Sequence, residues 1–336
     1  MEIRRTDPGD ASAFTDWYAL LRATDLERWP DVAGWDEQTV KAMASLRDGA
    51  TEFQCLAALD EDGLTRGIGL FELPRRDNLH GASLDVRVDL DHRRRGIGTA
   101  IVAEAHHRAR AAGRTALGGI SEVPTARRDT DVSAQFALSQ GFSAIQGSHR
   151  RHLPLPVDPD RLADLRDEVA KLTVGYRIFA FTAPWPSEYL NDQCELARRM
   201  STDAPNADAR HEEEVWDAAR VKEMDDLLLA QGLLKVTAVA EHLESGRLVA
   251  FSEIAVPEHR TEGWQWATLV LREHRGHRLG LAVKLANLDY LTTTVPTVRL
   301  LTTSNAAENA PMIDVNRAMG FEEVAEQTVW LKDLDA

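Results

Sequence analysis

The sequence predicts a mixed α/β fold that is present twice in one chain. Three landmarks recur in the same order at offsets of 182, 181 and 179 residues: Arg93–Ala100 with Arg275–Ala282, Leu70–Pro74 with Phe251–Ala255, and Gln140–Phe142 with Met319–Phe321. Within each half, strand patterns alternate with helix patterns, and strands come last. The chain of 336 residues, 43% of them hydrophobic, is long and apolar enough for two cores.

Alternating apolar residues and helical periodicity define the elements of the first half. Strands are predicted at Glu2–Thr6, Glu52–Leu59, Thr65–Leu73, Ala82–Val88 and Ala116–Ile120, with a hairpin or strand pair at Phe142–Leu153. Helices are predicted at Ala11–Ala23, Glu37–Arg47, Gly98–Ala112 and Val132–Ser139. Gly113 ends the third of these helices, because glycine readily adopts the left-handed conformation found after a helix C-terminus.

The second half repeats this plan after a proline-rich boundary at Pro154–Pro159. Strands are predicted at Tyr176–Phe181, Lys235–Glu241, Leu248–Val256, Gln265–Val270, Thr297–Thr303 and Glu323–Leu331. Helices are predicted at Glu188–Met200, Glu212–Ala230, Leu279–Leu291 and Ala310–Ala318. We therefore expect an N-terminal domain at 1–154, a linker with a helix (Leu162–Leu172) at 155–174, and a C-terminal domain at 175–336.

The charge balance narrows the possible partners. A net charge of −15 repels nucleic-acid phosphates and anionic lipid, whereas it favours a cationic partner such as an amine. Cys55 and Cys194 can form neither a disulfide framework nor a four-cysteine zinc site, and the eleven histidines show no metal-ligand spacing. We find no signal-peptide core and no apolar stretch of about 18 residues. We expect a cytoplasmic, metal-free bacterial protein that is a monomer or homodimer.

A glycine-containing turn follows a predicted strand in each half. The order strand, Arg-x-x-Gly-x-Gly, helix at Arg93–Gly98 exposes consecutive backbone N–H groups at a helix N-terminus, where they and the helix dipole attract a pyrophosphate. Arg93, Arg94 and Arg95 add cationic donors. The spacing is neither the G-x-G-x-x-G of a dinucleotide site nor that of a P-loop. The alternative is an arginine-rich turn that only caps a helix on a solvated face.

The string Val88–Ala100 resembles the acetyl-CoA-binding motif of the GCN5-related N-acetyltransferases, which reads Arg/Gln-x-x-Gly-x-Gly/Ala after a strand, and Val270–Gly280 is similar. The matching residues are Arg93, Gly96 and Gly98 in the first copy and Arg275 and Gly280 in the second. Arg278 stands where the family glycine usually does, with Gly276 close by. The second copy thus departs from the family pattern at one position.

The resemblance extends to the last helix of each half, which in the family reads Asn, seven residues later Tyr, and four residues later Gly-Phe. The second half has Asn309, Asn316 and Gly320-Phe321 at this spacing, and the first half has Thr130, Ala137 and Gly141-Phe142. Neither half therefore has the tyrosine. The whole chain looks like a tandem acetyltransferase, with two family domains in one polypeptide, as in mycothiol synthase and many actinobacterial relatives.

The resemblance implies acetyl-CoA as the acyl donor and direct attack of an amine on the thioester in a ternary complex. The strands before the turns would pair with the pantetheine arm, and a strand N–H would stabilise the oxyanion. The implied acetyl-CoA-binding residues are Val86, Val88, Arg93, Arg94, Arg95, Gly96, Ile97, Gly98, Thr99 and Ala100 in the first half, and Val270, Arg275, Gly276, His277, Arg278, Leu279, Gly280, Leu281, Asn305 and Asn309 in the second.

The candidate catalytic residues are two strand glutamates and an asparagine. Glu253 lies in an otherwise apolar strand pattern and Glu72 holds the same place in the first half, so a polar cleft beside them would make either a base. The alternative is that both face solvent or pair with an arginine. Asn316 either polarises the departing thiolate or only packs its helix. Asp203 either binds the acceptor amine or caps a helix.

The expected function is transfer of an acetyl group, or a larger acyl group, to the primary amine of a small molecule. We expect the chemistry in the second half, which has the better last helix, and coenzyme A binding in the first, which has the better turn. Activity in both halves is the alternative. A non-catalytic acyl-CoA sensor and a protein-lysine acetyltransferase are further candidates. Amino sugars, amino acids, polyamines, antibiotics and peptide N-termini all fit as acceptors.

Overall fold

The computed structural model describes residues 1–30, 32, 34–46, 49–203, 208, 210–257 and 261–335. The chain divides into two compact units, called below the first and the second unit. The first unit comprises Met1–Gly147, Ala207–His211 and Glu326–Ala336, and the second comprises Ser148–Asn206 and Glu212–Ala325. Each unit has a mixed sheet covered by helices, which confirms the predicted fold class.

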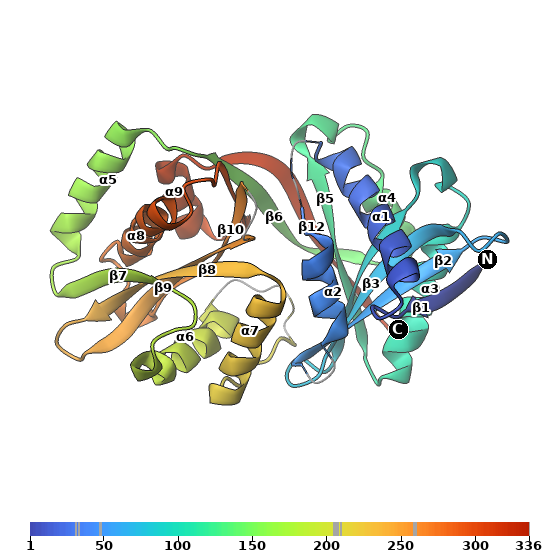
Figure 1. Ribbon diagram of the computed structural model, residues 1–336, viewed down its shortest axis with the longest axis horizontal. Helices are drawn as coiled ribbons and strands as arrows, with labels where there is room; N and C mark the ends of the chain where they lie inside the picture. The colour runs from blue at the N-terminus through green and yellow to red at the C-terminus, as the bar shows by residue number, and fades with distance from the viewer. Residues whose placement is uncertain are drawn as a thin grey trace. The chain divides into compact units, whose positions relative to one another are not determined.

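The sheet of the first unit has the strand order β1-β2-β3-β4-β5-β12 (Figure 1). Its strands are β1 (Glu2–Thr6), β2 (Thr51–Leu59), β3 (Thr65–Pro74), β4 (Gly81–Val88), β5 (Ala116–Pro124) and most of β12 (Glu322–Asp333). Its helices are α1 (Ala11–Arg28), α2 (Glu37–Ser45), α3 (Ile97–Ala111) and α4 (Ser133–Ser139). Strands β1 to β4 are antiparallel neighbours, whereas β4 and β5 are parallel because α3 crosses between them.

The sheet of the second unit has the order β6-β11-β10-β9-β8-β7. Its strands are most of β6 (Ser143–Pro154), β7 (Tyr176–Thr182), β8 (Leu233–His242), β9 (Arg247–Pro257), β10 (Glu262–Val270) and β11 (Leu300–Ala306). Its helices are α5 (Pro159–Leu172), α6 (Leu190–Asp203), α7 (Ala218–Ala230), α8 (Leu279–Thr294) and α9 (Ala310–Met319). The parallel pair is here β10 and β11, with α8 between them.

The last strand of each half lies in the other unit. Most of β6 pairs with β11 in the second unit, with Pro154 opposite Leu300, while most of β12 neighbours β5 in the first. The predicted domains, 1–154 and 175–336, are contiguous and so differ from these units. The predicted hairpin at Phe142–Leu153 is wrong, because this segment forms one long strand. Its partner is more than a hundred residues away, and local sequence patterns carry no such information.

Aspartates set the start of several helices. Helix α7 begins at Ala218 rather than at the predicted Glu212, because the Asp217 carboxylate accepts a hydrogen bond of 2.8 Å from the amide of Arg220. The aspartates that cap a helix in this way are Asp10, Asp36, Asp158 and Asp217. Each satisfies an N–H group that has no partner within its helix.

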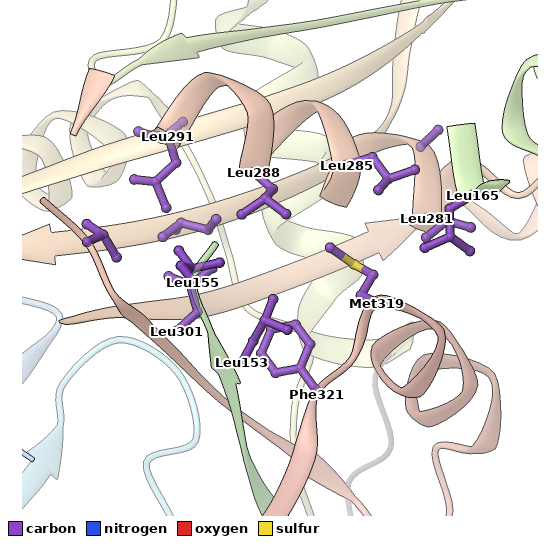
Figure 2. Packing of buried hydrophobic residues seen from close by; sticks show 14 of the residues in the cluster. Leu153, Leu155, Leu165, Leu281, Leu285, Leu288, Leu291, Leu301, Met319 and Phe321 are labelled. Carbon is purple, nitrogen blue, oxygen red and sulfur yellow. The ribbon is translucent and has the colours of Figure 1, made fainter. Parts of the chain in front are cut away.

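Each sheet is covered on both faces, and the side-chain alternation of the strands decides which residue meets which helix. In the first unit Ile68 of β3 packs on Phe14 and Trp17 of α1, while Phe71 meets Ile101 of α3 on the other face. The second unit repeats this plan, with α6 over one face and α5, α8 and α9 over the other. Figure 2 shows part of this core: leucines of α8 (Leu281, Leu285, Leu288 and Leu291) lie in one cluster with Leu165 of α5, Leu153 of β6, Leu155 after it, Leu301 of β11, Met319 at the end of α9 and Phe321.

Candidate functional site

The parallel strand pair of each unit parts after a short stretch of pairing. Strand β4 pairs with β5 from Gly81 to Ser83, although it continues to Val88. Strand β10 pairs with β11 only from Glu262 to Trp264, although it continues to Val270. The freed backbone N–H and C=O groups of both strands can therefore pair with an extended ligand laid between them.

The two units differ at the point of parting. In the second unit Trp266 and Ala267 of β10 lie opposite the single residue Glu253 of β9, which makes a β-bulge. In the first unit β3 and β4 keep an unbroken register, with Glu72 opposite Ser83. Each candidate glutamate thus lies on the strand next to the place where its parallel pair parts, so the fold brings glutamate and parting strands together.

The turn that follows each parted strand has the same backbone shape in both units. Two positions have positive φ angles: Arg94 (64°) and Gly96 (81°) in the first unit, Gly276 (90°) and Arg278 (55°) in the second. Glycine and arginine have exchanged places between the copies. Arg278 adopts the left-handed conformation of Gly96, so the departure from the family pattern leaves the shape of the turn unchanged.

Both turns present backbone amides. Among the hydrogen bonds of the described residues, the N–H groups of Arg94–Thr99 and of Gly276–Leu281 have no acceptor. The first paired helix amides are those of Ala100, which donates to Gly96 at 3.0 Å, and Ala282, which donates to Arg278 at 3.0 Å. The free amides stand at the positive end of the dipoles of α3 and α8, which is the physical arrangement of an anion site.

The first arginine of each turn is held in the same way in both units. Arg93 Nε donates to the carbonyl of Val88 at 3.4 Å and Arg275 Nε to that of Val270 at 3.2 Å. Each guanidinium also meets a carboxylate at the end of a helix, Glu27 at 2.8 Å in the first unit and Asp203 at 3.6 Å in the second. These contacts fix the guanidinium groups beside the turn while about half of their surface stays exposed.

Asp203 is the centre of an arginine cluster. Its side chain is 3% exposed and contacts the guanidinium groups of Arg199 at 3.1 Å, Arg272 at 3.0 Å and Arg275 at 3.6 Å. A carboxylate shared by three guanidinium groups is a counter-ion that holds cations near the turn of the second unit. This arrangement favours neither of the two roles considered for Asp203 from the sequence.

Glu253 forms a buried ion pair. Its Oε1 lies 3.0 Å from Nζ of Lys235 and accepts a hydrogen bond from Thr237 at 3.4 Å, and the Glu253 and Lys235 side chains are 15% and 8% exposed. It faces the side of the sheet covered by α6, because Phe251, two residues earlier, packs there. The predicted alternative of an arginine partner is thus replaced by a lysine. Asp225 of α7 joins this group electrostatically, and burial raises its pKa.

Glu72 lies on the matching face of the first unit, two residues after Leu70, which packs beside α1. No cation forms an ion pair with it among the residues that the structure describes. Burial raises the pKa of Glu72, with a smaller contribution from the charge of Asp85, while a hydrogen bond with Ser83 opposes the shift. A carboxyl group whose proton affinity is raised by burial suits a base that works near neutral pH.

Glu72→Gln is expected to stabilise the protein at neutral pH. The folded protein holds the Glu72 proton at a pH where the unfolded chain, with a pKa of about 4.3, releases it. The free energy of unfolding of the wild type therefore falls as the pH rises through this range. In denaturant unfolding, the advantage of the variant should be absent at about pH 4 and grow toward neutral pH.

Glu52→Gln is the matched control for this experiment. Burial raises the pKa of Glu52, but the hydrogen bond and charge of Arg75 and the charge of Arg5 outweigh burial and lower it overall. Its carboxylate therefore contributes stability above the unfolded pKa, and this contribution is lost as the pH falls. The control should destabilise the protein at neutral pH. If Glu72→Gln did the same, the raised pKa of Glu72 would be refuted.

The polar residues of α9 meet β11 in the second unit. Asn316 is completely buried; its Nδ2 donates to Oδ1 of Asn305 at 2.5 Å, and its own Oδ1 has no hydrogen-bond partner among the described residues. Asn309 precedes α9, and its side chain makes no capping hydrogen bond. Asn316 and Asn305 are therefore brought together. The position of Asn316 is taken in the first unit by Ala137, which packs against the core.

The structure places the predicted acetyl-CoA-binding residues along one continuous path in each unit. Val86 and Val88 belong to β4, Arg93–Gly96 to the turn, and Ile97–Ala100 to the first turn of α3. Val270 ends β10, Arg275–Arg278 form the turn, Leu279–Leu281 begin α8, and Asn305 lies in β11. Binding of coenzyme A by these residues stays a prediction.

Sequence reasoning missed a buried polar cluster in the second unit. Gln265 donates to Ser252 at 3.0 Å, and Asn287 of α8 donates to the Ser252 carbonyl at 2.9 Å. Lys284, one helical turn before Asn287, is 1% exposed. The available signal was a lysine inside an otherwise apolar helix pattern, where an exposed position is the usual interpretation. Within the described part of the chain, no helix could cross a membrane and no cluster of metal-ligating side chains occurs.

Comparisons with known proteins agree with this geometry. The profile of the acetyltransferase (GNAT) family matches residues 14–142, and no curated protein matches the sequence. A solved tandem GNAT protein from the clavulanic acid biosynthesis pathway is 27% identical, covers 99% of this chain and 98% of its own, and superposes with a TM-score of 0.81. A GCN5-related N-acetyltransferase from Sphaerobacter thermophilus is 16% identical, with coverages of 99% and 95% and a TM-score of 0.65, and shares the fold.

Proposed function

We propose that this chain transfers the acyl group of acetyl-CoA to a primary amine of a small molecule. Its residues 14–142 match the acetyltransferase (GNAT) family, and its two units have the tandem GNAT fold. One observation carries the proposal. In each unit a turn with free backbone amides follows a strand that has parted from its parallel neighbour. Such a site holds a diphosphate at one end and an extended amide-bearing arm along the strand.

The residues of this chain would act on the substrates as follows. The amides of Gly276–Leu281 and the exposed guanidinium of Arg275 bind the diphosphate of the donor in the second unit. The thioester then lies at the bulge of β10, where amides left out of the ladder stabilise the oxyanion. The amine nitrogen attacks the carbonyl carbon, the carbon–sulfur bond breaks, and its electron pair leaves with the thiolate.

The proposed base of the second unit is Glu253, which lies opposite the bulge. Its Oε1 lies 3.0 Å from Nζ of Lys235, which holds the carboxylate in place, and a carboxylate oxygen is the group that accepts the proton of the acceptor amine. In the first unit Glu72 holds the corresponding place without a cation partner among the described residues. Asn316, whose Nδ2 donates to Asn305, is the residue proposed to polarise the departing thiolate through its amide.

The second unit is the proposed site of chemistry, because three matched positions of the helices that follow the turn carry buried polar side chains there and apolar ones in the first unit. Lys284, Asn287 and Asn316 are all buried there. The first unit has Val102, Ala105 and Ala137 at these places. Buried polar groups without partners cost stability, so we infer that the polar interior of the second unit is kept for a ligand. The first unit is apolar at these positions, and we assign to it donor binding without turnover.

A small-molecule acceptor is favoured by two observations. The net charge of −15 attracts amines but repels nucleic acid. The 27% identical tandem GNAT protein comes from a pathway that makes a small molecule, clavulanic acid. A protein-lysine acceptor would need an open groove for a peptide, and nothing described in the structure favours one.

The proposal predicts release of free thiol from acetyl-CoA in the presence of a suitable small amine. A panel of amino sugars, amino acids, polyamines and peptides is mixed with the full chain and acetyl-CoA, and free thiol and acetylated amine are both quantified. Turnover with at least one small amine, and none with a lysine peptide, is the expected result. Tight coenzyme A binding without turnover on any amine would contradict the proposal and indicate an acyl-CoA sensor. Turnover restricted to peptides would indicate a protein substrate.

A further inference from the structure

Lys284 is a buried cation without a counter-ion. It lies in α8, the helix that starts at the turn of the second unit, and is 1% exposed. Among the described residues its Nζ has no hydrogen-bond acceptor and no carboxylate partner; the ring of Phe321 is 5.4 Å away. Phe321 follows α9 and lies in the apolar cluster drawn in Figure 2. The Lys284 amine is therefore directed into the space that α8 and the end of α9 share.

The neighbours of Lys284 link it to the β-bulge. Asn287, one turn further along the same face of α8, donates to the carbonyl of Ser252 at 2.9 Å. The hydroxyl of Ser252 in turn contacts Gln265 and Thr268, both at 3.0 Å, and these two residues flank the bulge of β10. The face of α8 that carries Lys284 thus covers the place where β10 parts from β11.

Two buried amide oxygens lack partners in the same region. Within the described part of the chain, Oδ1 of Asn287 and Oδ1 of Asn316 make no hydrogen bond, although both side chains are completely buried. Buried polar atoms are almost always paired, so unpaired acceptors on the same two helices, α8 and α9, that enclose the unpaired amine of Lys284 indicate that a polar ligand completes the cluster.

The fold itself does not require these polar groups. Lys284 and Val102 both stand nine residues after the first arginine of their turns, and Asn287 and Ala105 both stand twelve residues after it. Val102 and Ala105 are buried in the apolar core of the first unit. The same architecture is thus built with apolar side chains at both positions, and burial of an unpaired ammonium is strongly unfavourable.

We infer that Lys284 is the catalytic proton donor of the second unit, which gives its proton to the thiolate sulfur of coenzyme A as the carbon–sulfur bond breaks. This inference rests on the proposed function. The sulfur takes the electron pair of the broken bond and the proton of Lys284, so the thiol leaves neutral and the lysine is left as the neutral amine. The lysine regains a proton from the water that enters after the thiol has left.

The acidity of Lys284 suits this step. Burial lowers the pKa of Lys284 to about 7, while a free alkyl thiol has a pKa of about 8.5. Proton transfer from the ammonium to the thiolate is therefore downhill, and about half of the lysine carries its proton at neutral pH. Asn316, which stands where the family has a tyrosine, cannot supply this proton because its amide does not ionise.

The test compares Lys284→Met with the wild type in the full chain. Methionine has similar length and no charge, so the variant should fold and be more stable at neutral pH than the wild type, since it no longer buries an ammonium. Calorimetry with coenzyme A measures binding. The dependence of kcat on pH reports the protonation of the donor, and denaturant unfolding followed against pH reports the pKa of Lys284 without any turnover. Lys171→Met, which replaces an exposed lysine of α5 in the same unit, is the control.

The inference predicts that kcat of the wild type falls as the pH rises above about 7, where Lys284 loses its proton, whereas the free energy of unfolding rises over the same range, and that Lys284→Met shows neither change. Lys284→Met should also lose about 10²-fold in kcat with little change in KM. The same pH dependence of kcat in both proteins would overturn the role of Lys284 and leave the proposed function intact. Absence of coenzyme A binding to the wild type would overturn both.

Discussion

Replacing Gly276 by valine is expected to weaken coenzyme A binding by the second unit about tenfold or more. Gly276 has a φ of +90°, and a side chain added there would meet no atom within 4 Å. The free-energy cost of the valine side chain therefore comes from the backbone conformation and not from a steric clash. A β-branched residue in the left-handed region costs roughly 1–2 kcal/mol. In the variant the turn is therefore expected to adopt another backbone conformation, in which its amides no longer face the diphosphate. A loss of about 1.4 kcal/mol in binding corresponds to a tenfold weaker affinity.

The chain supplies a matched control for this substitution. Gly246, in the turn between β8 and β9, has a φ of +67° and also has open space around it. Gly246→Val should therefore lose similar stability but bind coenzyme A as the wild type does. In the first unit Gly96 (φ +81°) and Gly63 (φ +78°) form the equivalent pair. Calorimetric titration of the four variants separates the two binding events. Unchanged binding in both Gly276→Val and Gly96→Val would refute the turns as diphosphate sites.

The turns could be predicted from the sequence because their information is local. A strand, a run of arginines with glycine and a helix are encoded within about fifteen residues, and so is the alternation of exposed and buried positions. The sequence also indicated that Arg278 takes the place of a glycine, but not that it adopts the left-handed backbone of Gly96. That outcome depends on how the flanking strand and helix hold the turn.

The partners of the strands could not be predicted in the same way. Ser148–Pro154 pairs with β11, and Glu326–Asp333 lies beside β5, because strand pairing joins segments that are distant in the sequence. The same limit applies to the site. The pairing of Glu253 with Lys235 follows from the register of β8 and β9, in which Thr237 lies opposite Glu253. From the sequence, an arginine or solvent was the alternative considered for this glutamate.

The burial of Lys284 escaped prediction for a related reason. An isolated lysine in an apolar helix pattern usually extends its charged end to solvent. Whether it can do so depends on what covers the helix, and here the segment after α9 closes over it. The buried position of Lys284 could have been found by comparing the two halves at equal distance from the first arginine of the turn. Val102, an apolar residue, stands at that distance in the first half.

Glu253→Gln is expected to lower the free energy of unfolding by about 3 kcal/mol. The substitution keeps the size of the side chain but leaves the ammonium of Lys235, 8% exposed, without its main counter-ion. Removing one partner of a buried ion pair costs about 3–5 kcal/mol, because the other charge remains buried. Asp225, which interacts with Lys235 and whose pKa burial raises, takes over part of the compensation, so we expect the lower end of this range.

Loss of activity in Glu253→Gln would by itself not separate a base from a structural ion pair, and the double variant Lys235→Met/Glu253→Gln resolves this. Removal of both charges should return most of the lost stability, because no unpaired ammonium remains buried. If Glu253 is the base, the stable double variant still lacks turnover on the amine while it binds coenzyme A normally. If turnover returns together with stability, Glu253 serves Lys235 alone, and Glu72, which has no ion-pair partner among the described residues, becomes the base to test.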